Sequence, residues 1–128
     1  MNSFDGHHIV RALETIGAPM CMLDRVGVIA WTNAAARRLL GDERGALVGQ
    51  SFARFVTPEQ QPRVRQALAK MALGEAESVD LAVTATGFDG TLVDLDVSAS
   101  VVRIDEWAVG VILVGSDRRR RRRRLVNV

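Results

Sequence analysis

The chain has 128 residues and a mass of 14.0 kDa, which is enough for one domain with its own hydrophobic core. Hydrophobic residues make up 48% of it and there is a single cysteine, so disorder of the whole chain, an intramolecular disulfide and a cysteine-rich zinc site are excluded. The net charge of +2 is unevenly distributed: seven of the 17 basic residues form the tract 118–124, and the rest of the chain carries ten basic and 15 acidic residues. The basic charge therefore belongs to a tail that follows an acidic globule.

No apolar run approaches the length of about 18 residues that a transmembrane helix needs, the longest being residues 107–114. No signal-peptide pattern opens the chain, so we expect a cytoplasmic protein that does not associate with membranes. Because the composition changes after Asp117, we divide the chain into an N-terminal cap helix (1–17), a core domain (18–117) and an arginine-rich tail or linker (118–128).

The N-terminal part of the chain predicts a helix followed by a β-hairpin. Apolar residues at helical spacing indicate an amphipathic helix over residues 5–16. Two short apolar runs, at residues 20–23 and 28–31, are separated by a turn at 24–27 and predict a pair of antiparallel strands.

Two further helices are predicted in the middle of the chain. Thr32 or Asn33 can cap a short helix over residues 34–40. The sequence Thr-Pro-Glu-Gln at residues 57–60 has the pattern of a capping box and begins a longer helix. Since Pro62 removes a hydrogen-bond donor from the second turn, we expect a loose first turn and a regular helix from about Pro62.

The C-terminal half changes to the two-residue period of β-strands. Alternating apolar and polar residues at 79–86 and 93–101, around an Asp-Gly turn, predict a hairpin, and the wholly apolar run 107–114 predicts a central strand. We expect these three strands to form an antiparallel meander, with the apolar runs 20–23 and 107–114 side by side at the centre. The fold class is therefore α+β: a five-stranded antiparallel sheet with helices packed on one face, plus the N-terminal amphipathic helix.

This order of elements resembles that of the PAS sensory domain over residues 8–117. The first similar segment is a strand–turn–strand that leads into an Asn-x-Ala helix start (23–35). Two more are an apolar pair followed by glycine (47–50) and the Pro-Glu entry to the long helix (56–59). The last two are the hairpin turn (88–91) and the end of the core (114–117). The resemblance implies a cavity between the inner face of the sheet and the long helix. It also implies a non-catalytic role in signal transduction or transcriptional control.

Strand alternation, combined with the family's parity on the first strand, predicts which side chains line that cavity. The candidates are all apolar or nearly so: Cys21, Leu23, Val64, Ala67, Leu68, Met71, Leu81, Val83, Leu95, Val97 and Ile112. Packing alone is the ordinary state of such residues. The alternatives are a small aliphatic or fatty-acid-like ligand, some other metabolite, or a non-covalent cofactor. We expect Cys21 to be a buried and inert thiol.

The same residues argue against a cofactor or an enzyme. A haem would need an axial histidine near the long helix, whereas His7 and His8 precede the core. A covalent flavin would need a cysteine within residues 42–56, which contain none. Asp94 and Asp96 alternate with apolar residues and are expected on a solvated strand face, and no catalytic triad, phosphate loop or metal cluster is present. We therefore expect no catalysis, no metal and no cofactor.

The opposite face of the sheet predicts a protein contact. A soluble monomer rarely exposes a large apolar patch, so we expect a homodimer through the N-terminal helix and this face, with a monomer covered by its own helix as the alternative. The interface candidates are Ile9, Leu13, Ile16, Met20, Met22, Val109, Val111 and Leu113.

The tract from Arg118 to Arg124 is interpreted as a solvated linker, because seven like charges repel one another. Docking onto acidic groups is the second interpretation. Non-specific contact with nucleic acid is disfavoured, because no aromatic residues are interleaved with the arginines. The functional hypothesis is a sensory or regulatory PAS module that binds a small apolar ligand or a protein partner. It would signal to an output domain or partner through the residues after Asp117. The alternative is a constitutive dimerisation or protein-interaction module without a ligand.

Overall fold

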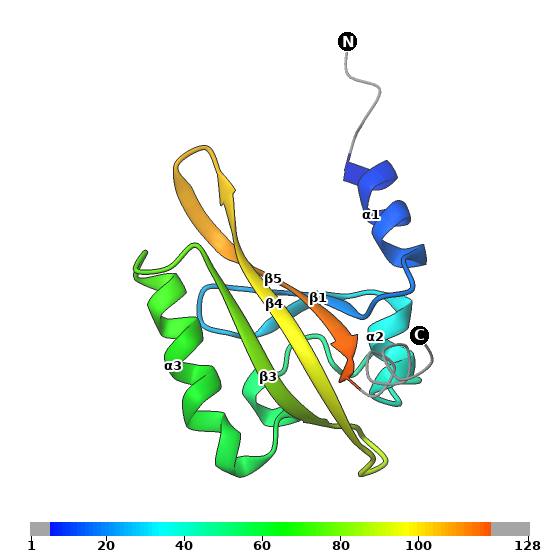
Figure 1. Ribbon diagram of the computed structural model, residues 1–128. Coiled ribbons are helices and arrows are strands. Elements are labelled where there is room, and N and C mark those ends of the chain that lie inside the picture. The colour runs from blue at the N-terminus through cyan, green and yellow to red at the C-terminus, as the bar shows by residue number, and fades with distance from the viewer. Residues whose placement is uncertain (1–5, 119–128) are drawn as a thin grey trace, which may run out of the picture.

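The computed structural model, shown in Figure 1, describes residues 6–118, and for residues 6–10 the backbone alone. Five antiparallel strands form one sheet in the order β2-β1-β5-β4-β3. The strands are β1 (Met20–Leu23), β2 (Ile29–Thr32), β3 (Ser78–Thr86), β4 (Leu92–Ile104) and β5 (Trp107–Asp117). The helical elements are α1 (Gly6–Thr15), α2 (Ala34–Leu39), the 3-10 turns η1 (Phe52–Phe55) and η2 (Pro58–Gln60), and α3 (Gln61–Ala72). The predicted α+β class, with five antiparallel strands, is confirmed.

The centre of the sheet contains β1 and β5, which carry the two apolar runs 20–23 and 107–114. β1 pairs with β5 so that Cys21 lies opposite Leu113, and β5 pairs in turn with β4, which pairs with β3. The predicted meander and the predicted contact between the first and last strands are both confirmed. β5 is thus the middle strand of the sheet, hydrogen-bonded to β1 on one side and to β4 on the other.

The inner face of the sheet, which packs against the helices, differs on β5 from the prediction. Leu113 lies between Cys21 and Ala99, and both Leu113 and Val111 are buried in the core. Ile112 alternates with them and lies on the outer face, opposite Met22. The expectation that Ile112 faces the interior and that Val111 and Leu113 face outward is therefore wrong. Residues 107–114 are all apolar or glycine, so the sequence does not indicate which of them face the interior. Pairing with the neighbouring strands decides this.

The entry to α3 begins as a 3-10 turn, as expected from Pro62, but it is not held by a capping box. Thr57 makes no side-chain capping bond, and Gln60 is used elsewhere: its Oε1 accepts the backbone N–H of Thr84 at 2.6 Å. This bond ties the start of α3 to β3. The predicted capping box is wrong because a tertiary partner takes the side chain that would have closed it.

Asn33 joins the N-terminal elements to the sheet. Its side chain is fully buried, and its Oδ1 accepts the backbone N–H of Ala36 at 3.0 Å, which caps α2, and that of Met20 at 2.9 Å, where β1 begins. Its Nδ2 donates to three backbone carbonyls at the end of α1 and in the linker after it, at 3.2, 3.4 and 2.9 Å: Leu13, Ile16 and Ala18. One amide therefore fixes where α1 leaves the core.

Figure 1 shows α1 standing beside the sheet and projecting away from it, not lying across its outer face. An ion pair between Glu14 and Arg37 of α2 adds to its attachment. Leu13 is half-buried and Ile16 is 41% exposed, whereas the side chain of Ile9 lies outside the described residues. α1 thus leaves part of the outer face uncovered.

Candidate functional site

The interior of the domain lies between the inner face of the sheet and the helical layer formed by α2, η1 and α3. A cavity of about 50 Å³ remains there. From the sheet it is lined by side chains that include Cys21, Val83, Ala85, Leu95, Val97 and Leu113. From the helical layer it is lined by Ala36, Leu39, Leu40, Phe52 and Phe55. Since one water needs roughly 10–15 Å³ of such space, the cavity holds only a few atoms.

Ten of the eleven predicted lining residues lie in or against this interior. Eight belong to one buried cluster: Cys21, Leu23, Val64, Met71, Leu81, Val83, Leu95 and Val97. Ala67 and Leu68 are half-buried against it, and Ile112 lies on the other face. The cluster brings these residues together, but only Cys21, Val83, Leu95 and Val97 border the 50 Å³ cavity.

The sequence interpretation missed the helical side of the cavity. Leu39 and Leu40 end α2, and Phe52 and Phe55 lie three residues apart on η1. The ring of Phe55 meets Phe88, from the β3–β4 turn, edge-on at 5.3 Å between centroids. The three-residue spacing of the two phenylalanines was the available signal, since i and i+3 share one side of a 3-10 turn.

The chemistry of the cavity wall is that of hydrocarbon with one thiol. Burial raises the pKa of the Cys21 thiol to about 12, so it is protonated at neutral pH and is a poor nucleophile. The buried polar residues of the described chain, Thr32, Asn33 and Asp42, do not border the cavity. Within residues 11–118, whose side chains are described, no three histidine, cysteine or carboxylate groups gather to hold a metal ion. His7 and His8 lie outside the described side chains.

Asp42 has a structural role in the loop after α2. Its carboxylate accepts the backbone N–H groups of Ala46 at 2.7 Å and Leu47 at 3.0 Å. Burial raises the pKa of Asp42, but these and neighbouring backbone N–H groups outweigh that effect, and the net pKa lies below its usual value. The ionised carboxylate thereby holds Leu47, which is fully buried, in the helical layer.

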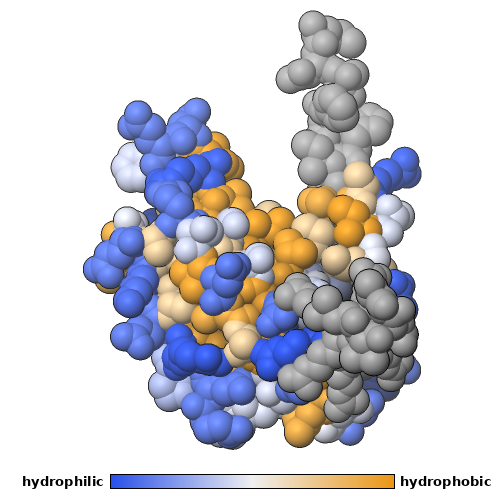
Figure 2. Space-filling view, in the orientation of Figure 1, coloured by the Kyte–Doolittle hydropathy of each residue, from blue (hydrophilic) through white to orange (hydrophobic). Residues whose placement is uncertain are grey.

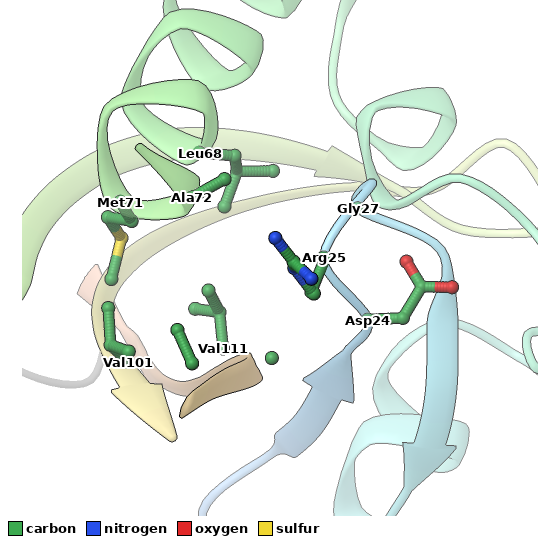
Figure 3. Close-up of a pocket in the computed structure, with 10 residues that line it drawn as sticks. Asp24, Arg25, Gly27, Leu68, Met71, Ala72, Val101 and Val111 are labelled. Atoms are coloured by element: carbon green, nitrogen blue, oxygen red, sulfur yellow. The ribbon is translucent and has the colours of Figure 1, made fainter. Parts of the chain in front are cut away.

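A second and smaller opening lies at the other end of the interior, between α3 and β5 (Figure 3). It has about 20 Å³ of free space and an apolar wall that includes Leu68, Met71 and Val111. Arg25, from the turn between β1 and β2, reaches into the opening, whereas the carboxylate of Asp24 points away from it. Arg25 is the cationic side chain among the residues that border the opening.

The outer face of the sheet is divided into an apolar and a polar half. Half-buried apolar side chains cover its β2-β1-β5 side, and Ser98, Ser100 and carboxylates follow on β4 and β3. Figure 2 shows the apolar surface between α1 and the projecting β4–β5 hairpin. On that hairpin Ile104 is 62%, Trp107 76% and Val109 39% exposed. The predicted outer patch is therefore present with a different membership: Met22 belongs to it, Met20 is buried, and Ile112 replaces Val111 and Leu113.

The first arginine of the basic tract contacts the polar half. Arg118 Nε lies 3.3 Å from Asp96 Oδ1, in a pair that is about one-third exposed. Residues 119–124, on which the linker and docking interpretations of the tract depend, lie outside the described residues. No helix within residues 6–118 has both the length and the apolar character needed to cross a bilayer.

Comparison with known proteins agrees with this architecture. The family model of the PAS fold matches residues 7–118. No curated protein matches the sequence. Among solved structures, the PAS domain of an HTR-like protein from Haloarcula marismortui is 17% identical with a TM-score of 0.73, covering 87% of this chain and 89% of that chain.

Two further structures are similar in fold. The PAS domain of a protein from Colwellia psychrerythraea is 13% identical with a TM-score of 0.76, covering 87% of this chain and 94% of its own. The PAS domain of the Cronobacter turicensis RpfR quorum-sensing receptor, in complex with BDSF, is 17% identical with a TM-score of 0.68. The match covers 80% of this chain and 95% of that chain. At these identities the similarity concerns the fold.

Proposed function

Because the chain belongs to the PAS family, whose members are sensory and signalling modules, we propose that it senses a small apolar molecule through its interior. Occupancy of the interior would be relayed along β5 to the residues after Asp117, and from there to an output domain or signalling partner. Such a relay suits a regulator of signal transduction or transcription. The solved RpfR domain with bound BDSF is a relative in fold that carries a ligand.

The observation that carries this proposal is the position of the cavity against β5. Leu113 and Gly115 border the cavity, and the strand ends two residues later at Asp117. Close-packed interiors transmit a change in volume to their surroundings, because few voids can absorb it. A group that enlarges the cavity therefore pushes on the strand that leads out of the domain.

The test is native mass spectrometry of the protein purified from its source, with a matched pair of variants on β3. Ala85→Val fills space in the cavity wall, and Ala82→Val adds the same atoms at an exposed position on the same strand. We expect a non-covalent adduct that is retained by the wild type and by Ala82→Val and lost from Ala85→Val. Repeated absence of any adduct from the wild type would contradict a ligand sensor and favour a constitutive interaction module.

We also propose that the domain forms a homodimer through the apolar half of the outer face. Two copies related by a two-fold axis can bury their apolar halves against each other while the carboxylates of the polar halves remain in water. α1 and the β4–β5 hairpin flank this surface, and neither covers it (Figure 2). Sedimentation at micromolar concentration should give a dimer for the wild type and for Ser98→Glu, and a monomer for Ile112→Glu. A wild type that sediments only as a 14 kDa species contradicts the dimer.

The absence of catalysis and of a resident cofactor is part of the same proposal. The cavity wall offers one thiol whose pKa burial raises to about 12, and the charged residues that border the smaller opening are Asp24 and Arg25. General acid–base or nucleophilic chemistry would need a titratable group near neutrality inside the site. We place the working protein in the cytoplasm. An ultraviolet–visible spectrum of the purified protein, taken before any denaturing step, checks for haem or flavin.

A further inference from the structure

The opening between α3 and β5 has an amphiphilic character that the main cavity lacks. Its wall is apolar, with Leu68, Met71 and Ala72 on the helix facing Val101 and Val111 on the sheet. A single cation, Arg25, stands at its rim and reaches from the β1–β2 turn toward Leu68 and Ala72 (Figure 3). The site therefore joins a hydrocarbon surface to one positive charge.

The guanidinium of Arg25 is unpaired within the described part of the chain. Among residues 6–118, Arg25 has no hydrogen-bonding or ion-pair partner. The neighbouring Asp24 is committed to the turn, where its Oδ1 accepts the backbone N–H groups of Val26 at 2.9 Å and Val28 at 3.0 Å. The guanidinium presents a planar set of donors that matches a carboxylate.

An arginine stem often lies over an apolar rim without further function. Six described arginines reach a carboxylate, an amide or a backbone carbonyl of the chain. Arg11, Arg38 and Arg44 share with Arg25 the lack of such a partner among the described residues, but of these four only Arg25 borders the opening between α3 and β5. A guanidinium over apolar side chains leaves its donors to water or to a ligand. Charge complementarity then selects an anion, and the surrounding wall selects an apolar tail.

We infer that the ligand of this domain is an aliphatic carboxylate whose headgroup binds Arg25 and whose chain enters between α3 and the sheet. This inference rests on the proposed ligand-sensing function and deepens it by naming the ligand class, the entrance and the residue that selects it. Arg25 pairs with the carboxylate at the rim, and no bond is made or broken.

The chain can enter because the side chains that close the opening are able to move. The free space is about 20 Å³, so the ligand has to displace Leu68 and Met71. Met71 is fully buried, but its unbranched thioether side chain adapts to new packing at small cost. Leu68 is half-buried and lies over Gly27, where a Cβ atom would stand 3.6 Å from Leu68 Cδ1, so the missing side chain of the glycine leaves Leu68 room to shift. Displacing these two side chains opens a path from Arg25 toward the buried cluster.

The experiment compares two probes of equal chain length, decanoate and decan-1-ol, binding to the full chain at pH 8 by isothermal titration calorimetry. Wild type should bind decanoate about tenfold more tightly than the alcohol, the factor that 1.4 kcal/mol of charge-assisted hydrogen bonding gives. Arg25→Ala should reduce decanoate affinity to that of decan-1-ol, and Arg25→Lys should retain part of the preference. Arg44→Ala, at an exposed position in the loop after α2, is the matched control and should behave as wild type.

A second pair of variants tests the entrance independently of charge. Ala72→Trp places a large ring at the rim, and Ala69→Trp places the same ring at an exposed position one turn earlier on α3. Ala72→Trp should abolish binding of both probes, and Ala69→Trp should leave both unchanged. Added salt should weaken decanoate binding and not decan-1-ol binding, because screening acts on the headgroup pair.

The outcomes separate this inference from the proposed function. If both probes bind the wild type equally, or if Arg25→Ala keeps the preference for decanoate, the role of Arg25 is wrong and the apolar sensor stands. If both probes still bind to Ala72→Trp, the entrance is wrong. If neither probe binds the wild type while an endogenous adduct is retained in native mass spectra, the ligand class is wrong. If neither an adduct nor a probe is seen, the proposed function fails as well.

Discussion

The side chain of Asn33 should be the most sensitive polar position in the domain. Asn33→Ala removes an amide that serves two backbone donors and three backbone acceptors around a fully buried site. The change takes the N-cap from α2 and leaves the N–H of Met20, at the start of β1, without its acceptor. It also releases the carbonyls at the end of α1.

The magnitude follows from these groups. Loss of an N-cap costs about 1 kcal/mol, and a buried donor left without a partner costs about 1–3 kcal/mol. Asn33→Ala should therefore lower the free energy of unfolding by about 3 kcal/mol and Tm by roughly 10 °C for a domain of this size. Asn33→Ser can still cap α2 but cannot reach the carbonyls of α1, so it should recover about 1 kcal/mol.

Urea unfolding followed by circular dichroism measures the loss, and hydrogen exchange locates it. The midpoint should fall with an unchanged m-value, and the amides of α1 should exchange faster in both Asn33 variants. Ser51→Ala is the control, because Ser51 precedes η1 without making a side-chain capping bond. If Asn33→Ala loses less than about 1 kcal/mol, or no more than Ser51→Ala, the account of this residue is refuted.

Three further predictions concern the interior and its loops. Leu113→Ala should cost about 3 kcal/mol and Ile112→Ala about 1 kcal/mol or less in urea unfolding, because the first lies in the core and the second on the outer face. Equal losses would contradict the register of β5. The folded-state pKa of Asp42 is lowered, so its contribution to stability is present above its unfolded pKa of about 3.9 and is lost as pH falls through the folded value. The urea midpoint should therefore drop more steeply in wild type than in Asp42→Asn below about pH 4, and parallel curves would refute this. Cys21, whose pKa burial raises to about 12, should react with a thiol reagent at pH 8 only after unfolding. Prompt labelling of the native protein would show that it is not buried.

The sequence predicted a helix or strand correctly where its hydrophobic period and the residues that mark its ends indicated the same element. The alternation of β3 and β4 around an Asp-Gly turn, the helix that Asn33 caps, and the loose first turn before Pro62 were all predictable from neighbouring residues. The contact between the apolar runs of β1 and β5 was predictable because fully apolar strands belong at the centre of a sheet.

The inward face of β5 was not predictable, because its run 107–114 is apolar or glycine at every position and shows no alternation of apolar and polar residues. Its orientation comes from tertiary contacts, with Leu113 held between Cys21 and Ala99. The same limit applies to Gln60, whose amide bonds Thr84 on β3 instead of closing a capping box. In both cases a partner distant in sequence overrides a local pattern.

The candidate site was predictable on its sheet side and on α3, and less so on α2 and η1. Leu39, Leu40 and Phe55 reach the cavity because the loop held by Asp42 folds the helical layer over the sheet. That loop has no hydrophobic period of its own. The sequence pattern also gave no reason to select Arg25, since a charged residue in a turn is ordinarily solvated. Only the packing of α3 beside that turn places Arg25 at an apolar opening.

We propose that a molecule bound in the interior alters β5 and that this change reaches the segment after Asp117. Hydrogen exchange of the full chain, with and without saturating decanoate, tests this directly. We expect altered exchange in α3 and, at the same ligand concentration, along β5 from Val111 to Asp117. Decanoate binding that alters exchange in α3 alone, with β5 unchanged to its end, would contradict it.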